Sequence, residues 1–195
     1  MTTLSFENYQ KGEIVAENIE LSTEPYVLDF LERAGEDLDL NFKRVGRFEN
    51  STKKCGYNLN LNLEEGVEYG HRKHEQWIYI LAVDGRVCKI GQTTKTLVDR
   101  WASYSAGTRD NRVKRGTCST TNYFISEIVR RALEEEVDVE LYAYAIPNTY
   151  TVGSIFGREE KLLDDHVGIY ESRLMQEFFN IYGRSPIVGK NGLAK

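Results

Sequence analysis

The sequence of 195 residues predicts a domain of mixed α/β (α+β) class, and three patterns lead to this prediction. Two runs of apolar, β-branched and aromatic residues flank Asp84 and Gly85 in "WIYILAVDGRVCKIG", residues 77–91, which is typical of a β-hairpin. The stretch "VDVELYAYAIP", residues 137–147, alternates in the manner of a third strand. Apolar residues at helical spacing occur between and after these strands, so helices are expected beside them.

The first 74 residues are expected to form a structured extension that packs on a domain built by residues 75–195. Within the extension, "TEPYVLDFLERAGE" predicts a helix, because apolar residues recur at helical spacing after Thr23, a plausible N-cap. Gly35 is expected to end this helix. The alternation of leucine with asparagine at 59–63 predicts a half-buried strand.

The segments after the hairpin are predicted as helices and loops around the third strand. A capping pattern of Thr96 and Asp99 opens a short helix that closes near Gly107. An apolar stripe through residues 123–137 predicts a second helix. The remaining segments are a basic loop at 108–117, a loop at 148–158, a long helix at 159–183 and an irregular tail at 184–195.

The turn of the hairpin decides which residue of its second strand lies beside Tyr79. A two-residue turn at Asp84 and Gly85 pairs Tyr79 with Ile90. A three-residue loop with Gly85 in the left-handed conformation pairs Tyr79 with Lys89 instead, which brings a phenol beside an ammonium group. The sequence leaves both registers open.

Charge is distributed unevenly along a chain whose formal net charge is −5. Residues 86–131 contain 10 basic and 3 acidic side chains, whereas the segments on either side of this part are acidic or balanced. A local basic block can still bind phosphate, because at physiological salt a surface field is dominated by charges within about 10 Å. A solvated basic face is the alternative interpretation of the same charges.

Cysteine usage and hydropathy exclude several classes of protein. Cys55, Cys88 and Cys118 stand far apart without a C-x-x-C pair, which argues against a disulfide scaffold and a structural zinc site. No run approaches the roughly twenty apolar residues that span a bilayer, and the N-terminus lacks a basic region followed by an apolar one. We therefore expect a soluble, cytoplasmic protein without a membrane partner.

Four polar side chains of the hairpin and the following helix are candidates for one site. Arg100 and Tyr104 are neighbours because they lie four residues apart on a helix, and Tyr79 and Lys89 lie on the two strands. Hydrolysis of an anionic phosphodiester requires neutralisation of developing charge and a deprotonated nucleophile. Arg100 could bind two phosphate oxygens, and Lys89 could lower the pKa of Tyr79 so that the phenolate acts as a base. Taken singly, Tyr79 is also explained as a core aromatic residue and Arg100 as a solvated one.

The same stretch resembles the GIY-YIG nucleases. "WIY", residues 77–79, stands at the position of the first motif of that family, and "KIG", residues 89–91, stands at the position of the second. The resemblance continues through Thr93, Arg100 and Tyr104. Trp replaces the first Gly and Lys replaces the second Tyr, and the latter change resembles a subgroup that contains phage proteins and some Type II restriction endonucleases.

A glutamate on the last predicted helix extends the resemblance, which covers residues 75–191. The metal-binding Glu of the family lies in an E-x-x-L-x-x-x-F setting, and "ESRLMQEFF" supplies Glu171 in that setting. Pro186 and Asn191 follow as in the family, and Asn180 is an alternative to Asn191.

The resemblance implies a small domain with a central three-stranded sheet flanked by helices, with an insertion before the metal-binding helix. It implies DNA hydrolysis with one divalent cation, usually Mg²⁺ or another such as Mn²⁺, bound by Glu171. Arg100 would bind the phosphate, Tyr79 with Lys89 would activate water, and Tyr104 would orient the nucleophile or the phosphate. The implied products carry 5′-phosphate and 3′-hydroxyl ends.

These observations predict a sequence-specific endonuclease of Type II restriction type that cuts double-stranded DNA. Such small enzymes read palindromes as two-fold dimers, so we expect a homodimer. Arg109, Arg112, Lys114 and Arg115 are expected to bind phosphate or read guanine edges. The alternatives are a structure-directed or phage-type nicking nuclease of the same fold and a nucleic-acid-binding module without catalysis. The presence of all five polar positions favours an enzyme.

Overall fold

The computed structural model describes residues 3–10, 13–38, 40–50, 59–64, 76–108 and 110–189. At the centre of the described part is an antiparallel sheet with the strand order β4-β3-β7-β5-β6. The strands are β3 (Lys43–Asn50), β4 (Leu59–Leu63), β5 (Gln76–Val83), β6 (Arg86–Thr93) and β7 (Val139–Ile146). The predicted mixed α/β class is confirmed. The strands predicted at 77–91 and 137–147 are β5, β6 and β7, and the strand predicted at 59–63 is β4. Strand β3, which was not predicted, extends the sheet to five. The division of the chain into residues 1–74 and 75–195 stays a prediction.

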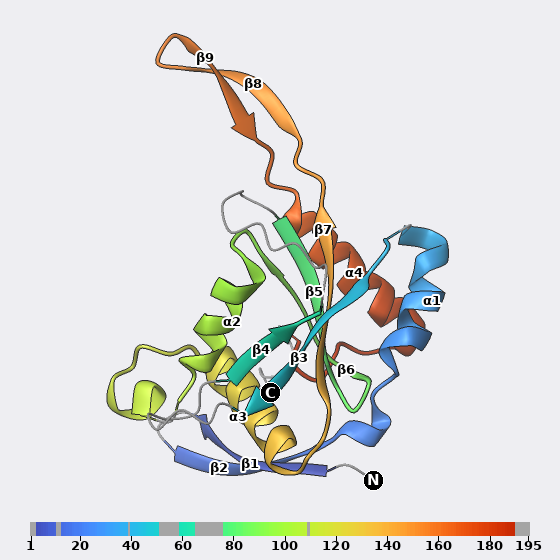
Figure 1. Cartoon of the computed structure of the whole chain (residues 1–195), viewed down its shortest axis with the longest axis vertical. Coiled ribbons are helices and arrows are strands. Elements are labelled where there is room, and N and C mark those ends of the chain that lie inside the picture. The colour runs from blue at the N-terminus through green and yellow to red at the C-terminus, as the bar shows by residue number, and fades with distance from the viewer. Residues whose placement is uncertain are drawn as a thin grey trace.

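Helices cover both faces of the sheet (Figure 1). They are α1 (Val27–Leu38), α2 (Leu97–Ser105), α3 (Thr120–Glu134) and α4 (Val167–Tyr182), with a short helical turn at Asp110–Lys114. Helices α2 and α3 pack on one face, and α1 and α4 pack on the other. Because β5 is covered on both faces, all of its residues are buried. Trp77, Tyr79 and Leu81 face α2 and α3 together, because successive side chains of a strand alternate between its two faces.

The register of the β5–β6 hairpin differs from both predicted alternatives. Asp84 and Gly85 form a two-residue turn, and both have positive φ, as the twist of a hairpin favours. A bulge then leaves Cys88 of β6 without a partner in β5. Because a bulge inserts one residue into the ladder, Tyr79 lies opposite Gly91, and both predicted pairings of Tyr79 are wrong.

A two-stranded ribbon projects from the body between β7 and α4 (Figure 1). Its strands are β8 (Tyr150–Ile155) and β9 (Arg158–Leu163). Positive φ at Phe156 and Gly157 reverses the chain, so the charged residues that follow pair as a strand. The predicted loop at 148–158 and the predicted helix at 159–183 are therefore wrong in part, because the helix begins only at Val167.

The first helix differs from its prediction at both ends. Thr23 belongs to a short 3₁₀ helix, Leu21–Thr23, and does not cap α1. Gly35 lies inside α1, so the predicted stop is wrong. A glycine ends a helix when it adopts the left-handed conformation, and Gly35 does not have positive φ.

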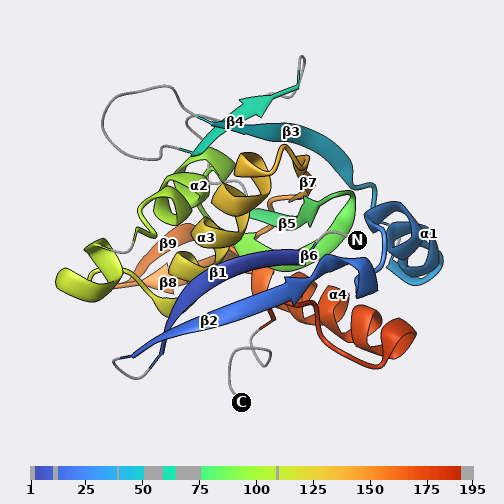
Figure 2. The same ribbon diagram turned by 90° about the horizontal axis from the view of Figure 1, so that it is seen from below.

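A second ribbon, which the sequence patterns did not predict, lies along α3 (Figure 2). Its strands are β1 (Thr3–Gln10) and β2 (Glu13–Glu20). Leu4 and Leu21 are fully buried in the cluster that contains the α3 side chains, so this segment packs on the core. Within the part of the chain that the structure describes, no helix combines the length and the apolar character needed to cross a bilayer.

Candidate active site

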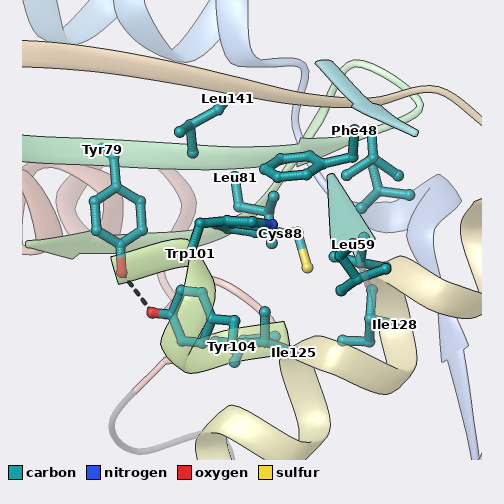
Figure 3. Packing of buried hydrophobic residues seen from close by; sticks show 14 of the residues in the cluster. Phe48, Leu59, Tyr79, Leu81, Cys88, Trp101, Tyr104, Ile125, Ile128 and Leu141 are labelled. Carbon is teal, nitrogen blue, oxygen red and sulfur yellow. Dashed lines mark hydrogen bonds between the residues drawn. The ribbon is translucent and has the colours of Figure 1, made fainter. Parts of the chain in front are cut away.

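Three of the five predicted site residues meet between β5 and α2. The hydroxyls of Tyr79 and Tyr104 lie 2.5 Å apart and share a hydrogen bond, which is the dashed line of Figure 3. Arg100 Nε donates to the Tyr79 hydroxyl at 3.2 Å, and the guanidinium lies over the Tyr104 ring, 4.7 Å from its centroid. The predicted cap of α2 is confirmed, because the Thr96 hydroxyl accepts from the Asp99 N–H at the start of the helix.

Burial fixes the two tyrosine rings, and aromatic neighbours pack on Tyr104 (Figure 3). Tyr79 and Tyr104 are fully or almost fully buried. Trp101 meets Tyr104 edge-on, with ring centroids 5.2 Å apart, and packs on Phe48 with ring centroids 3.8 Å apart. Rings in such contacts cannot rotate freely, so both hydroxyls are held in place before any ligand binds.

Gly91 makes room for the Tyr79 side chain at the edge of the sheet. A Cβ atom at this position would lie 2.5 Å from Tyr79 Oη and 2.6 Å from its Cζ. The ring therefore crosses β6 directly over Gly91, and β6 is the edge strand. Gly91 stands inside a strand of the sequence, where glycine is a sign that another group approaches the backbone closely.

Lys89 and Glu171 line one pocket of 330 Å³ between β6, α4 and the segment that follows α4. Two serine hydroxyls and several apolar side chains complete its walls. Lys89 is 8% exposed, and Glu171 is half-buried. The backbone N–H of Val188 donates to the Cys88 carbonyl at 3.0 Å, which holds the segment after α4 against β6. The pocket is thus built from parts of the chain that are far apart in sequence.

The pocket and the tyrosine pair are close enough to interact electrostatically. The Glu171 carboxylate is one of the groups that raise the pKa of Tyr79, and such an effect weakens with distance. Tyr79 lies on the face of the sheet covered by α2, whereas α4 brings Glu171 from the other face. All five predicted residues are therefore grouped around the edge strand β6.

Burial raises the pKa of the Tyr79 phenol, and the charge and hydrogen bond of Arg100 offset this effect only in part. Burial also raises the pKa of Tyr104. Both side chains are therefore neutral phenols at neutral pH. The net shift is opposite in direction to the expected lowering of the Tyr79 pKa, because desolvation outweighs the effect of the neighbouring cation Arg100. A contribution from Lys89 to this pKa stays a prediction.

Gln76 joins β5 to α4 and was not predicted from the sequence. Its side chain is 2% exposed, and Oε1 accepts from the backbone N–H groups of His166 and Val167, each at 2.9 Å. Its Nε2 donates to the Asp164 carbonyl. The amide thus satisfies N–H groups at the start of the helix that carries Glu171 and ties that helix to β5. The signal available in the sequence was a glutamine at the start of an apolar strand, where a polar side chain needs a hydrogen-bond partner.

The basic residues after α2 differ in their accessibility. The guanidinium of Arg112 donates to the Cys118 carbonyl at 3.0 Å within its own loop. Lys114 is exposed and forms an ion pair of 2.9 Å with the aspartate four residues before it. Arg115 is exposed. Arg109 lies outside the described residues, so Lys114 and Arg115 are the two described candidates that a ligand can reach without rearrangement.

The side chains that could bind a cation beside Glu171 are few among the described residues. Asn191 lies outside the described residues, and Asn180 is exposed on α4, where it accepts from Gln176 at 2.8 Å. Among the described side chains there is no group of three or more His, Cys, Asp or Glu that could hold a metal. Mg²⁺ does not require such a group, since it is usually bound by one or two carboxylates, substrate phosphate and water. Glu171, half-buried in the pocket beside Lys89, fits a site of this kind.

Comparison with known proteins identifies two solved structures of similar fold. No protein-family model and no curated protein matches the sequence. A structure of restriction endonuclease HPY188I in complex with product DNA matches with a TM-score of 0.53 and 23% identity, over 90% of this chain and 89% of that chain. A mutant of bacteriophage T4 EndoII matches with a TM-score of 0.51 and 18% identity, over 77% of this chain and 96% of that chain. The chain therefore has a fold similar to that of these two proteins.

Proposed function

We propose that the protein is a DNA endonuclease that hydrolyses phosphodiester bonds with the help of a divalent cation. The observation that carries this proposal is the grouping of Tyr79, Arg100 and Tyr104 beside a pocket lined by Lys89 and Glu171. Buried polar and charged groups cost free energy, so a purely structural core would place apolar residues there. The likeness in fold to a restriction endonuclease solved with product DNA supports the same activity.

Arg100 and Lys89 would supply the positive charge that a phosphodiester requires. The Arg100 guanidinium is held beside both phenols, through Nε to Tyr79 and over the Tyr104 ring, and a guanidinium can bind two phosphate oxygens in a bidentate fork. Lys89 would act on the same anion from the edge strand. Both groups would stabilise the charge that develops when water attacks phosphorus.

Tyr79 would accept the proton of the attacking water through Oη. Because its pKa is raised, the phenolate is the minor species at neutral pH, and the hydrogen bonds from Arg100 and Tyr104 would stabilise it when it forms. Tyr104 would in addition orient the nucleophile or the phosphate. Lys89 is the alternative base, and the pH dependence of its variant distinguishes the two.

Glu171 is the residue that would hold Mg²⁺ or Mn²⁺ in the pocket beside Lys89. When bound, the cation would stabilise negative charge on the leaving 3′ oxygen. The products would then carry 5′-phosphate and 3′-hydroxyl ends. Asn191 is retained as a further candidate beside this site on the family resemblance alone.

We further propose the finer assignment to the GIY-YIG nucleases with KIG in place of YIG, and to the Type II restriction endonucleases among them. The substrate would be double-stranded DNA, cut at a specific sequence by a homodimer. Lys114, Arg115 and Arg109 would contact phosphates or base edges. The bond of Arg112 to the Cys118 carbonyl favours a role for Arg112 in shaping that loop.

Digestion of a long duplex DNA of known sequence, with Mg²⁺ and with EDTA, tests the proposal directly. Discrete bands with common termini that require Mg²⁺ are expected, and sequencing of the ends would identify the cleavage site. Random nicks would favour the nicking nuclease of the same fold. Intact DNA with every divalent cation would refute the nuclease proposal and favour a binding module.

The Glu171→Gln variant tests whether the Glu171 carboxylate holds the cation, because it removes one charge and keeps the size of the side chain. It is expected to bind DNA in a gel-shift assay and to lose metal-dependent cleavage. Cleavage at the wild-type rate by this variant would rule out Glu171 as the residue that holds the cation.

A further inference from the structure

We propose that the free edge of strand β8 is the surface through which two copies of this chain pair. This proposal rests on the homodimer proposed above and assigns the contact between its two copies to β8. The β8–β9 ribbon projects away from the rest of the protein (Figure 1), and its two strands hydrogen-bond only to each other among the described strands. An isolated two-stranded ribbon is marginally stable in water, so a further strand would stabilise it.

The two edges of the ribbon differ in charge. Strand β8 contains no charged residue and no proline, whereas β9 carries the run Arg158, Glu159, Glu160 and Lys161. Charges and prolines are the features that protect an exposed strand edge from pairing with another chain. The edge of β9 is protected in this way, and the edge of β8 is open.

Exposed apolar side chains gather on the same ribbon. Val152 is 71% exposed, Tyr150 and Ile155 are more than two-fifths exposed, and Phe156 at the tip is fully exposed. Apolar side chains that are grouped on the surface commonly mark an interface with another protein. The net charge of the described ribbon is zero, which fits a protein partner better than a polyanion.

Two-fold symmetry selects a register for this pairing. Antiparallel strands related by a two-fold axis place one residue opposite its own copy. Ile155 and Arg158 close the two-residue turn of the ribbon, so the outward-facing backbone groups of β8 belong to Tyr150, Val152 and Ser154. Centring the pair on Val152 places valine opposite valine and tyrosine opposite serine.

Two-fold pairing of β9 with its own copy is unfavourable. By the same criterion the outward-facing charged residues of β9 are Glu159 and Lys161, and a two-fold axis at either residue places two like charges directly opposite each other, which is destabilising. The charge pattern therefore selects β8 over β9 as the pairing strand. The resulting sheet would contain four strands in the order β9-β8-β8-β9.

Disulfide cross-linking tests the register. In a hydrogen-bonded antiparallel pair the Cα atoms lie about 5.5 Å apart, a separation that a disulfide spans. Val152→Cys is therefore expected to give a covalent dimer on mild oxidation without DNA or metal. Thr151→Cys is the matched control, since its copy would be a diagonal neighbour at about 7–8 Å. Both variants are made in a Cys55→Ser background, because Cys88 and Cys118 are buried.

Sedimentation without DNA tests the surface independently of the register. The wild type is expected to form a concentration-dependent dimer, and Val152→Lys is expected to weaken the dimer at least tenfold by placing a charge on the open edge. Ile169→Lys is the control, because Ile169 on α4 is 67% exposed and the substitution adds the same charge.

A wild type that stays monomeric, a Val152→Lys dimer of normal affinity, or cross-linking of Val152→Cys that does not exceed that of Thr151→Cys would each overturn the proposal. Altered DNA binding by Val152→Lys with an unchanged oligomeric state would show that the ribbon contacts DNA instead. A chain that pairs but does not cut DNA would refute the proposed nuclease activity and leave the pairing surface standing.

Discussion

Replacement of Gly91 by alanine tests how the site is built. The added Cβ would lie 2.5 Å from Tyr79 Oη, whereas ordinary contact begins at 3.4 Å, so the hydroxyl would have to move by about 0.9 Å (3.4 minus 2.5). The hydrogen bonds of this hydroxyl to Tyr104 at 2.5 Å and from Arg100 at 3.2 Å leave little room for such a movement. The substitution therefore has to disturb the packing, the hydrogen bonds, or both.

Overpacking of a core costs about 1–3 kcal/mol, and misplacement of a reacting group by about 1 Å can cost about 100-fold in rate. We expect Gly91→Ala to lower the free energy of unfolding by about 1–3 kcal/mol and the rate of DNA cleavage by about 100-fold. Urea unfolding measures the first quantity, and single-turnover cleavage of duplex DNA at saturating enzyme measures the second.

Gly35→Ala is the matched control for this substitution. No atom lies within 4 Å of a Cβ at Gly35, which is inside α1, so alanine should stabilise the protein by about 0.5–1 kcal/mol and leave cleavage unchanged. Adding Gly91→Ala to Tyr79→Phe should cause little further loss of rate. A folded Gly91→Ala protein that cuts DNA at the wild-type rate would refute the argument that Tyr79 acts from its position over Gly91.

Three further predictions concern the same site. Burial raises the pKa of Tyr79 above its usual value of 10.0, so the phenolate fraction should rise about tenfold per pH unit below that pKa. The cleavage rate should therefore rise with pH, and this rise should be absent in Tyr79→Phe. The neutral phenol stabilises the fold below pH 10 and this contribution is lost as the pH rises through the raised pKa, so Tyr79→Phe should also lose less Tm in alkali. Lys89→Ala should slow cleavage most near neutral pH and recover in part at high pH; a rate profile without recovery would mean that Lys89 acts on the phosphate or the water itself. Gln76→Leu should lower the free energy of unfolding by about 1–3 kcal/mol per N–H group left unpaired at the start of α4, measured by urea unfolding, and an unchanged value would show that water replaces the amide.

Local patterns predicted the parts of the fold that local physics governs. The cap at Thr96 and the strands around Asp84 and Gly85 follow from hydrogen bonds and periodicities within a few residues of each other. The same patterns failed where pairing partners decide. The segment 159–163 is charged and resembles a solvated helix, but it becomes a strand because the turn before it delivers it to β8.

The candidate site shows the same division. The sequence alone, through its spacing and its family resemblance, singled out Tyr79, Lys89, Arg100, Tyr104 and Glu171. Their order along the chain could not say that Arg100 donates a hydrogen bond to Tyr79, or that the bulge at Cys88 places Gly91 opposite Tyr79.

Composition and spacing by themselves determined a mixed α/β domain with a cluster of phenolic, basic and acidic candidates, since residue types and local periodicity are properties of the chain. Only the tertiary structure decided that Gly91 lets Tyr79 cross the edge strand and that Gln76 ties α4, with Glu171, to β5. It also decided that burial is the largest influence on the pKa of Tyr79 and raises it. The physical reason is that close contact and desolvation arise only when segments distant in sequence pack together.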